Sequence, residues 1–499
     1  MAGADRRHNL LVLSDLHLGE DLRPATKTGY LRHLLILERE LEAFLDYYGS
    51  RRMDDRPWRL IVNGDMVDFL SVCLIPGDNE AIPPDMAGID PEEAVYGLGT
   101  KPLAVCHKMR RVLERHPKVF RALARFLGKG NSLAIIAGNH DVEFHWPVVQ
   151  ETFRRGIAAL WIAESDKPGD SGGQRSLGEP DEQGDLGEPG EPGEIERAIS
   201  FHPWFYFEEN VAWIEHGHQY DDYCSFDYVL DPVAPKKQEI VLSISAACYR
   251  YVLNQAQSYC SSQEDWSGWK YLRWAVAQGY RTVLQLAKAY SLMVFRLLGL
   301  WRSLVRPEDS ETRRRTHEER LRSLAAQFKL GEDVLLALDS LRRQPVVKNL
   351  TRLALAIMLD RFLLVVAAAL LVLVWIIALP FGRAMMSALV TVIVVWIAGS
   401  LLARARCPVD PSPKLETIPR LIRQLVHAPF VVFGHSHCPI AHPLPDGGWY
   451  FNTGTWVAGD RQDILAAFTH LLIRQGERGP EAVLCQWRDG QSRTYVPLH

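Results

Sequence analysis

The stretch Leu10–Leu18, LLVLSDLHL, is a short apolar run that ends in two polar side chains, Asp15 and His17. The same arrangement recurs four times. Leu60–Val62 runs into NGDMVD (63–68), Ser132–Ala137 into GNHD (138–141), Val211–Ile214 into EHGH (215–218), and Phe430–Phe433 into GHSH (434–437). Short apolar runs that alternate with helical segments are typical of layered α/β folds, in which strand ends meet at a common edge. The sequence therefore predicts an α/β fold with five polar motifs gathered in one cleft.

These motifs consist of residue types that bind divalent metals. Each one supplies Asp, His or Asn, and none contains cysteine. Such ligands suit borderline ions such as manganese, iron, zinc or nickel. In an extended D-x-H segment alternate side chains point to one face, so Asp15 and His17 are expected to reach one ion, and so are His435 and His437.

Glycine stands directly before three of the polar residues, at Gly64, Gly138 and Gly434. We expect these glycines to let the backbone turn sharply where each strand ends. Any one of the short motifs arises often by chance. Five of them in order, each after an apolar run, predict a single functional site.

The series D-x-H, G-D-x-x-D, G-N-H-D, H-G-H and G-H-x-H resembles the calcineurin-like metallophosphoesterases, over about residues 9 to 224 and 426 to 499. The resemblance implies a two-sheet αββα metallophosphoesterase sandwich with a dinuclear metal centre at one end. It also implies a metal-dependent hydrolase in which a metal-bridging hydroxide attacks a phosphomonoester, phosphodiester or diphosphate. Two divalent ions are expected, with manganese favoured and iron, zinc or nickel as alternatives.

The resemblance assigns the metal ligands residue by residue. The implied ligands are Asp15, His17 and His437 for the first metal, Asn139, His216 and His435 for the second, and Asp65 as the bridge. His218 is an alternative to His216. We prefer the first position because relatives with an H-G-D version use it, and His218 would then act behind the metal or touch substrate.

Two further residues carry implied catalytic roles. His140 is the candidate general acid that protonates the departing oxygen, and Asp68 matches the family position that hydrogen-bonds this histidine. Asp141 is expected to support the loop. His145 and His202 stand beside aromatic residues, so we interpret them as packing or surface residues.

Two uncharged apolar stretches, 362–379 and 384–403, are 18 and 20 residues long. As helices they would reach about 27 to 30 Å, close to the thickness of a hydrocarbon core. Only Pro380-Phe381-Gly382-Arg383 separates them. This pattern predicts a transmembrane hairpin, and the alternative is a buried helical hairpin inside a globular domain.

Several features predict where the chain resides. Lys348, Arg352 and Arg361 precede the first stretch, and Arg404 and Arg406 follow the second. The positive-inside rule then places the rest of the chain in the cytoplasm, at the inner (cytoplasmic) membrane. No apolar signal core precedes the first motif, and the eight scattered cysteines are expected to be free thiols. The net charge of -4 gives no reason to expect nucleic acid.

The predicted organisation has three parts. They are a first metallophosphoesterase part at 9–224 with a disordered loop at 166–194, a helical insertion at 225–425, and a last part at 426–499. Within the insertion, 282–301 suits a helix on the membrane surface or, equally, an amphipathic helix packed on the domain. Arg313–Arg315 fit either contact with anionic headgroups or a solvated helix face.

The insertion separates two ligand-bearing motifs, so we expect membrane lipids as partners and a lipid-linked substrate as one candidate. UDP-2,3-diacylglucosamine pyrophosphatases also open with an S/A-D-L-H-L strand and act at the inner membrane. They carry Arg in place of His140 and H-G-D at 216–218, so their substrate is not carried over. The alternative function is a catalytically silent membrane scaffold with this fold. A nuclease lacks support, because no basic groove with interleaved aromatics is visible.

Overall fold

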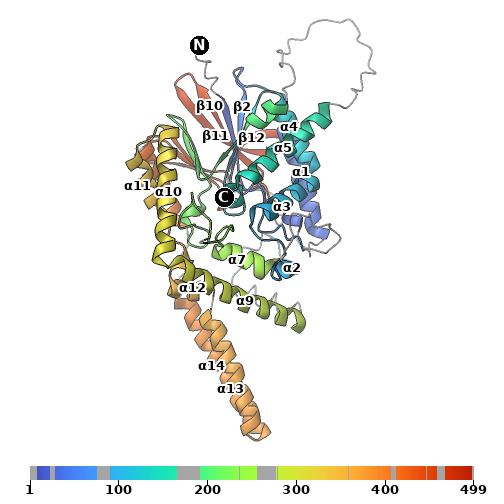
Figure 1. The fold of residues 1–499 in the computed structure, drawn as a ribbon, viewed down its shortest axis with the longest axis vertical. Helices are drawn as coiled ribbons and strands as arrows, with labels where there is room; N and C mark the ends of the chain where they lie inside the picture. The colour runs from blue at the N-terminus through green and yellow to red at the C-terminus, as the bar shows by residue number, and fades with distance from the viewer. Residues whose placement is uncertain are drawn as a thin grey trace.

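A computed structural model describes residues 8–22, 28–75, 90–165, 192–234, 236–255, 273, 277, 279–357, 359–405, 412–445, 447–457 and 467–496. Two mixed β-sheets form the centre of a body that helices cover, and a helical hairpin projects away from one end of it (Figure 1). The predicted α/β class is confirmed.

The larger sheet has seven strands in the order β12-β11-β10-β1-β2-β3-β4. Their bounds are β1 Asn9–Leu13, β2 Trp58–Asn63, β3 Ser132–Ile136, β4 Ile199–His202, β10 Thr469–Gly476, β11 Gly479–Arg488 and β12 Gln491–Thr494. Strands β1 to β4 pair in parallel, so their carboxyl ends meet at one edge, whereas β10 joins β1 antiparallel.

The smaller sheet has five strands in the order β5-β6-β7-β9-β8. Their bounds are β5 Phe205–Glu208, β6 Ala212–Glu215, β7 Phe430–Phe433, β8 Ile440–Pro443 and β9 Trp449–Asn452. Strands β6, β7 and β9 run parallel. Adjacent strands β6 and β7 are thus joined by all the residues between 215 and 430.

The sheets face one another because side chains alternate along each strand. Leu10 and Val12 of β1 pack with Ile214 of β6 and Val432 of β7 in the layer between the sheets. The intervening residues of β1 point to the opposite face, where helices cover them. Burying a leucine or valine side chain contributes roughly 1.5–3 kcal/mol, so this alternation fixes which face each strand presents to which layer.

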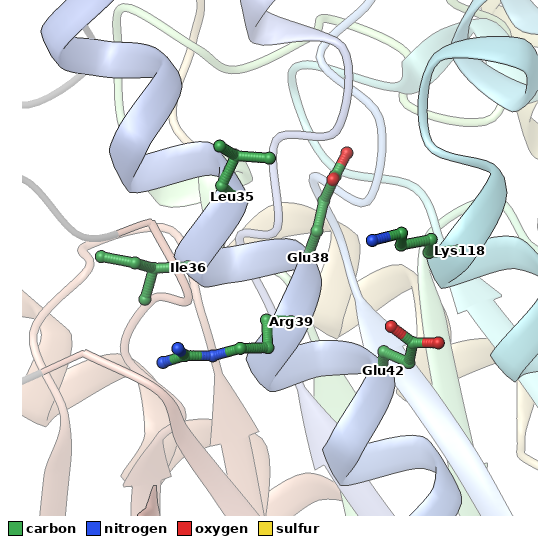
Figure 2. A pocket seen from close by; sticks show the side chains of 6 residues that line it. All are labelled: Leu35, Ile36, Glu38, Arg39, Glu42 and Lys118. Atoms are coloured by element: carbon green, nitrogen blue, oxygen red, sulfur yellow. The ribbon is translucent and has the colours of Figure 1, made fainter.

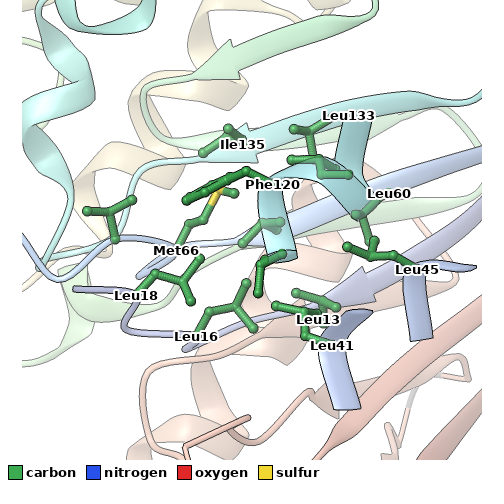
Figure 3. Close-up of a cluster of buried hydrophobic side chains, with 14 of the residues drawn as sticks. Leu13, Leu16, Leu18, Leu41, Leu45, Leu60, Met66, Phe120, Leu133 and Ile135 are labelled. Carbon is green, nitrogen blue, oxygen red and sulfur yellow. The ribbon is translucent and has the colours of Figure 1, made fainter. Parts of the chain in front are cut away.

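The outer face of the larger sheet carries the largest apolar cluster. Strand residues Leu13, Leu60 and Leu133 pack against Leu41 of α1 and Phe120 of α4 (Figure 3). The helices on this side are α1 Thr28–Gly49, α3 Pro102–Arg115, α4 Pro117–Gly128, α5 Pro147–Ser165 and α6 Pro192–Arg197. The short helix α2 Glu93–Tyr96 packs elsewhere, with Tyr96 against Tyr251. Pro102 and Pro117 open their helices, where a missing N–H costs nothing.

The remaining helices lie between β6 and β7 in the chain. They are α7 Ile244–Tyr251, α9 Tyr280–Leu304, α10 Pro307–Phe328, α11 Glu332–Ser340, α12 Leu350–Ala356, α13 Leu359–Ala378, α14 Phe381–Ala405 and α15 Ser412–Val426. Helices α10, α11 and α15 bury apolar residues such as Leu321, Leu335 and Ile422 against the outer face of the smaller sheet. The predicted insertion at 225–425 therefore supplies one layer of the α/β body as well as the hairpin.

The hairpin consists of α13 and α14, which pack against each other. Within the described residues one helix is long and apolar enough to cross a membrane, Phe381–Gly399, with 6% of it buried, which agrees with the second predicted span. On α13 the described residues include the apolar stretch Val366–Ala378, so the first predicted span stays a prediction. The predicted loop is also shorter, because α14 begins at Phe381, directly after Pro380, a residue that readily precedes a helix.

Two other predictions meet the structure only in part. The predicted disordered loop at 166–194 lies outside the described residues except for its end, which is helical because α6 begins at Pro192. Arg313 is buried rather than facing headgroups or solvent, and its guanidinium donates to the Asp231 carbonyl and stacks on Tyr228. Arg314 and Arg315 are exposed and pair with Glu311 on their own helix.

Candidate metal centre

All five sequence motifs meet at one end of the two sheets. Those that follow β1, β2 and β3 stand side by side because these strands pair in parallel. The motifs after β6 and β7 approach them from the smaller sheet. His216 donates from Nδ1 to the Asn63 carbonyl (2.8 Å), and the Gly434 amide donates to the His216 carbonyl (3.0 Å). The first bond joins the two sheets at the centre, and the second joins the motifs that follow β6 and β7.

One group of possible ligands consists of Asp15, His17 and His437, whose ligand atoms lie within 4.8 Å of one another. His437 Nε2 lies 3.2 Å from Asp15 Oδ1, and His17 Nε2 lies 3.9 Å from the same oxygen. These are the three residues implied as ligands of the first metal. The structure brings them together, and their coordination of an ion stays a prediction.

A second group adjoins the first through Asp65. His216 Nε2 lies 3.1 Å from Asp65 Oδ2 and 3.2 Å from Asn139 Oδ1, and His17 Nε2 lies 3.9 Å from that carboxylate oxygen. The other oxygen, Asp65 Oδ1, accepts a hydrogen bond from the His140 amide (2.8 Å). Asp65 thus stands between the two groups, where the implied bridging ligand is expected.

His435 has a partner that sequence reasoning missed. Its ring lies 5.3 Å from that of His216, but its Nε2 donates to Asp221 Oδ2 (3.2 Å). This bond leaves Nδ1 as the nitrogen with a free lone pair. Asp221, Cys224 and His435 form a further group whose ligand atoms lie close together. The spacing H-x-x-D from His218 to Asp221 was the only sequence signal for this carboxylate.

The two histidines of H-G-H occupy different places. His216 faces Asp65 and Asn139, whereas His218 Nε2 bonds to the Gln219 side chain (2.7 Å) and its ring packs on Phe226. Burial, and then the nearby His216 and His435, hold the pKa of His218 well below its usual value. The geometry therefore favours His216 as the ligand and puts His218 behind it.

His140 is held on both sides. Its Nδ1 donates to Asp68 Oδ1 (2.9 Å), which leaves Nε2 as the other exchangeable nitrogen. Its ring packs edge-on against His17 at 4.6 Å and against Tyr249 of α7 at 5.1 Å between ring centroids. Asp68 therefore orients His140 as the resemblance implies. Tyr249 gave no sequence signal, because α7 reaches the centre only through tertiary packing.

The backbone around these residues is not extended, which corrects the predicted D-x-H geometry. The residues with left-handed φ values are Asp15 (55°), His17 (47°), Asp65 (54°), His435 (66°) and His437 (57°). This region costs non-glycine residues about 1–3 kcal/mol each and is concentrated at functional sites. Turns after the strands, rather than strand pleating, aim both side chains of each pair at the centre.

Two of the three glycines serve a different purpose from the predicted one. Gly64 has φ +82° and does turn the chain, but neither Gly138 nor Gly434 has a positive φ. A Cβ at Gly138 would stand 2.7 Å from the Asp65 amide nitrogen, and one at Gly434 would stand 2.9 Å from Asp15 Oδ2. These two positions exclude larger residues because the carboxylates approach so closely.

The pKa values of the residues in the centre depend strongly on burial and on the charges of their neighbours. Burial alone would raise the pKa of Asp65, but the His216 and His140 imidazoles outweigh it and hold that pKa well below its usual value. Burial would lower the pKa of His216, but Asp65 and Asp15 raise it to about 9. Burial and the nearby Asp65 raise the pKa of Asp141 to about 7. Asp141 accepts from the Gly138 and Met66 amides, so it supports the loop as predicted.

Buried polar atoms without hydrogen-bond partners indicate that the residues of the candidate centre fit a metal ion. Among the described residues these atoms include Asp15 Oδ1, both ring nitrogens of His17 and Asp68 Oδ2. Leaving a buried polar atom unpaired costs about 1–3 kcal/mol, so a cation would satisfy what the protein leaves open. The buried His and Asp groups can therefore hold a metal ion. The side chains of His435 and His437 are partly exposed, at 19% and 31%, so the centre opens on their side.

The other candidates lie elsewhere. His145 packs against Trp146 and His202 against Tyr206, in agreement with the predicted packing roles. A cavity of about 300 Å³ lies between α1 and α4 and is lined by Leu35, Ile36, Glu38, Arg39, Glu42 and Lys118 (Figure 2). It contains none of the predicted site residues.

Comparisons with protein-family models, curated proteins and solved structures found no match to this chain.

Proposed function

We propose that this chain is a membrane-anchored, metal-dependent phosphoesterase that hydrolyses a phosphomonoester, phosphodiester or diphosphate. The observation that carries the proposal is the position of Asp65. Its Oδ2 lies 3.9 Å from His17 of one possible ligand group and 3.1 Å from His216 of the other. A carboxylate shared between two groups of buried ligands is the arrangement that a two-metal hydrolase requires.

Membership of the calcineurin-like metallophosphoesterases is part of the proposal. It is supported by the order of the five motifs and by two facing sheets with helices on their outer faces. The motif residues would hold two ions, with manganese favoured over iron, zinc or nickel. Bound ions of this kind supply an activated hydroxide and offset negative charge on the phosphoryl group.

The chain's own side chains would position the ions and move one proton. Asp15, His17 and His437 would bind on one side of Asp65, and Asn139, His216 and His435 on the other. His140 would donate a proton from Nε2 to the departing oxygen, because Asp68 fixes its other nitrogen at 2.9 Å. Tyr249 limits the motion of the His140 ring from the side of α7.

The apolar hairpin supports the membrane part of the proposal. One of its helices is long and apolar enough to span a bilayer, and most of its surface is exposed. Basic residues on the body side of the hairpin favour a cytoplasmic catalytic body at the inner membrane.

The test is hydrolysis by the full chain, purified in detergent, stripped with a chelator and reloaded with manganese. The wild type is expected to bind two ions and to hydrolyse nitrophenyl phosphate, bis-nitrophenyl phosphate or a nucleoside diphosphate. Asp65→Asn is expected to lose bound metal and at least about 100-fold in rate, because the shared carboxylate holds both groups.

Asp339→Asn is the matched control, since Asp339 is a buried aspartate that bonds His317 Nε2 (3.1 Å) far from the motifs in sequence. It should keep both metal and activity. Equal activity of Asp65→Asn and the wild type would contradict the bridging role. A folded wild type that binds metal but turns over none of the esters would favour the silent membrane scaffold.

A further inference from the structure

Helix α9, Tyr280–Leu304, has two distinct faces. One face carries Ala289, Met293, Leu297 and Leu304, which are buried in a cluster with residues of α7 and α12. At 100° per residue these four lie on one side of the helix. Half of the helix is therefore an ordinary packing face, which fits one of the two predictions made for this segment.

The opposite face exposes large apolar side chains between cations. Leu284 and Phe295 are 65% and 70% exposed, and they stand 11 residues apart, about three full turns, on one stripe. Lys288 and Arg302 lie on or beside the same stripe. Within the described residues neither cation makes an ion pair, and the 25 residues of α9 include no Asp or Glu. A soluble helix face usually carries both signs of charge and no such phenylalanine.

The position of α9 relative to the hairpin explains this face. Helix α9 runs across the end of the body from which the hairpin projects, with α7 on its body side (Figure 1). The Tyr290 hydroxyl donates to the Ile357 carbonyl at the end of α12, directly before α13. The face with Leu284 and Phe295 therefore looks in the direction in which the apolar hairpin extends.

We propose that this face of α9 binds the surface of a bilayer rich in anionic phospholipids. Apolar side chains between lysines and arginines, without acids, are complementary to acyl chains beneath negatively charged headgroups. The hairpin, which follows α12 in the chain, also exposes apolar side chains. An acidic protein surface would pair with the cations but would leave the apolar stripe in water.

The contact also determines what reaches the candidate centre. Tyr251 of α7 packs in the α9 cluster, and its hydroxyl donates to Glu92, which pairs with Arg296 of α9. Tyr249 of the same short helix touches His140. Helix α7 therefore contacts both α9 and the proposed general acid. Resting on the proposed function, this assigns the substrate to phosphate groups carried on membrane lipids.

The test uses the full chain in nanodiscs of phosphatidylglycerol or of phosphatidylcholine. Phe295→p-benzoylphenylalanine should crosslink to lipid on irradiation, detected by mass spectrometry, with a higher yield in phosphatidylglycerol. The same replacement at Leu35, which is 58% exposed on α1, is the matched control and should give little lipid adduct. Absence of a lipid adduct at position 295, or equal yields at both positions, would overturn the proposal.

Charge reversal tests the headgroup contact. Lys288→Glu with Arg302→Glu should lower the lipid adduct at position 295 about threefold or more in phosphatidylglycerol and leave it unchanged in phosphatidylcholine. Arg39→Glu with Arg155→Glu makes the same charge change on exposed helices elsewhere and should have no effect. No difference between the two double variants would contradict the role of the cations.

The substrate class is tested with dioleoyl phosphatidic acid in the same nanodiscs and with soluble nitrophenyl phosphate. Lys288→Glu with Arg302→Glu should slow hydrolysis of the lipid about threefold or more and leave the soluble ester unaffected, which also shows that the variant is folded. Equal rates on the lipid before and after reversal would overturn the substrate assignment. A wild type that crosslinks to lipid but hydrolyses neither ester would refute the proposed function and, with it, the substrate assignment, while the membrane contact would stand.

Discussion

The candidate metal centre and the helical hairpin depart from the usual burial pattern in opposite directions. The centre buries ionisable side chains, with Asp15 fully inaccessible and Asp65 1% exposed. The hairpin exposes large apolar ones, such as Ile377 at 77% and Phe381 at 83%. In most soluble domains ionisable side chains are exposed and large apolar side chains are buried.

The difference shows what each region requires from outside the chain. Buried carboxylates and imidazoles with unpaired atoms are costly unless a cation satisfies them. An exposed apolar surface is costly in water and stable in hydrocarbon. The cores of the two sheets have the ordinary pattern and need neither. Substitutions in each region should therefore show whether the centre requires a cation and whether the hairpin requires a hydrocarbon environment.

The largest effect is expected at the proton donor. His140→Gln should slow hydrolysis of an alkyl phosphate by about 10²- to 10⁴-fold and that of nitrophenyl phosphate far less, because nitrophenolate leaves without a proton. Bound metal, measured by elemental analysis, should not change. Asp68→Asn should also slow hydrolysis of the alkyl phosphate more than that of nitrophenyl phosphate, but by a smaller factor than His140→Gln. A uniform loss on both esters would point to a structural role for His140.

Close packing at the centre predicts the next largest effect. Gly138→Ala would place a Cβ 2.7 Å from the Asp65 amide nitrogen, so the carboxylate must move. Activity should fall by about 100-fold, with a matching fall in bound metal. Gly299→Ala is the control, since nothing lies within 4 Å of that position on α9. It should keep full activity and gain about 0.5–1 kcal/mol of stability.

The hairpin provides the opposite test. Leu370→Asp and Val390→Asp place charges near the middle of helices whose side chains there are 59% and 52% exposed. Each should weaken membrane retention, at a cost of about 2.5–3.5 kcal/mol in a bilayer. The measurement is the fraction that stays with membranes after a carbonate wash. Leu35→Asp, on an equally exposed part of α1, should not change it; unchanged retention of the hairpin variants would mean that the apolar surface faces protein.

The smallest effect concerns a buried imidazole that lies outside the candidate centre. His470 bonds Tyr48 (3.0 Å) and Ser492 (2.9 Å), and burial lowers its pKa to about 3. An unfolded histidine has a pKa of about 6.5, so between these values the unfolded chain binds an extra proton. The free energy of unfolding should therefore fall as pH drops from about 6.5 toward 3, by up to about 1.4 kcal/mol per unit.

Urea unfolding at pH 7 and pH 5 measures this slope. His470→Gln removes the proton uptake, so its unfolding free energy should fall less steeply over the same interval. Identical slopes would show that another group accounts for the acid sensitivity. The comparison separates a buried imidazole outside the candidate centre from the imidazoles inside it.

Much of the site could be predicted because its residues come directly after strands. Leu10–Leu13 and Ser132–Ile136 are apolar runs, and each leads at once into its polar motif, so parallel pairing was enough to bring Asp15 and Asn139 to one edge. The backbone geometry could not be predicted. Left-handed φ values at Asp15 and His437 are set by the surrounding packing, since isolated chains avoid that region.

Partners that come from distant segments also escaped prediction. Asp221 reaches His435 across more than 200 residues of chain, and Tyr249 reaches His140 because α7 folds back over the centre. Neither contact has a local pattern in sequence. The burial of Arg313 likewise depends on the residues that pack beside it.

The order of the amino acids was sufficient to establish the α/β class, the places of the five motifs and the presence of an apolar hairpin. These properties are local: they depend on which residues are apolar, on their period, and on the polar residues that come next in the chain. Tertiary packing alone set Asp65 between two groups of possible ligands, turned His216 rather than His218 toward it, and placed α9 across the end of the body from which the hairpin projects. Those are relations between segments far apart in the chain, and close packing of side chains fixes them.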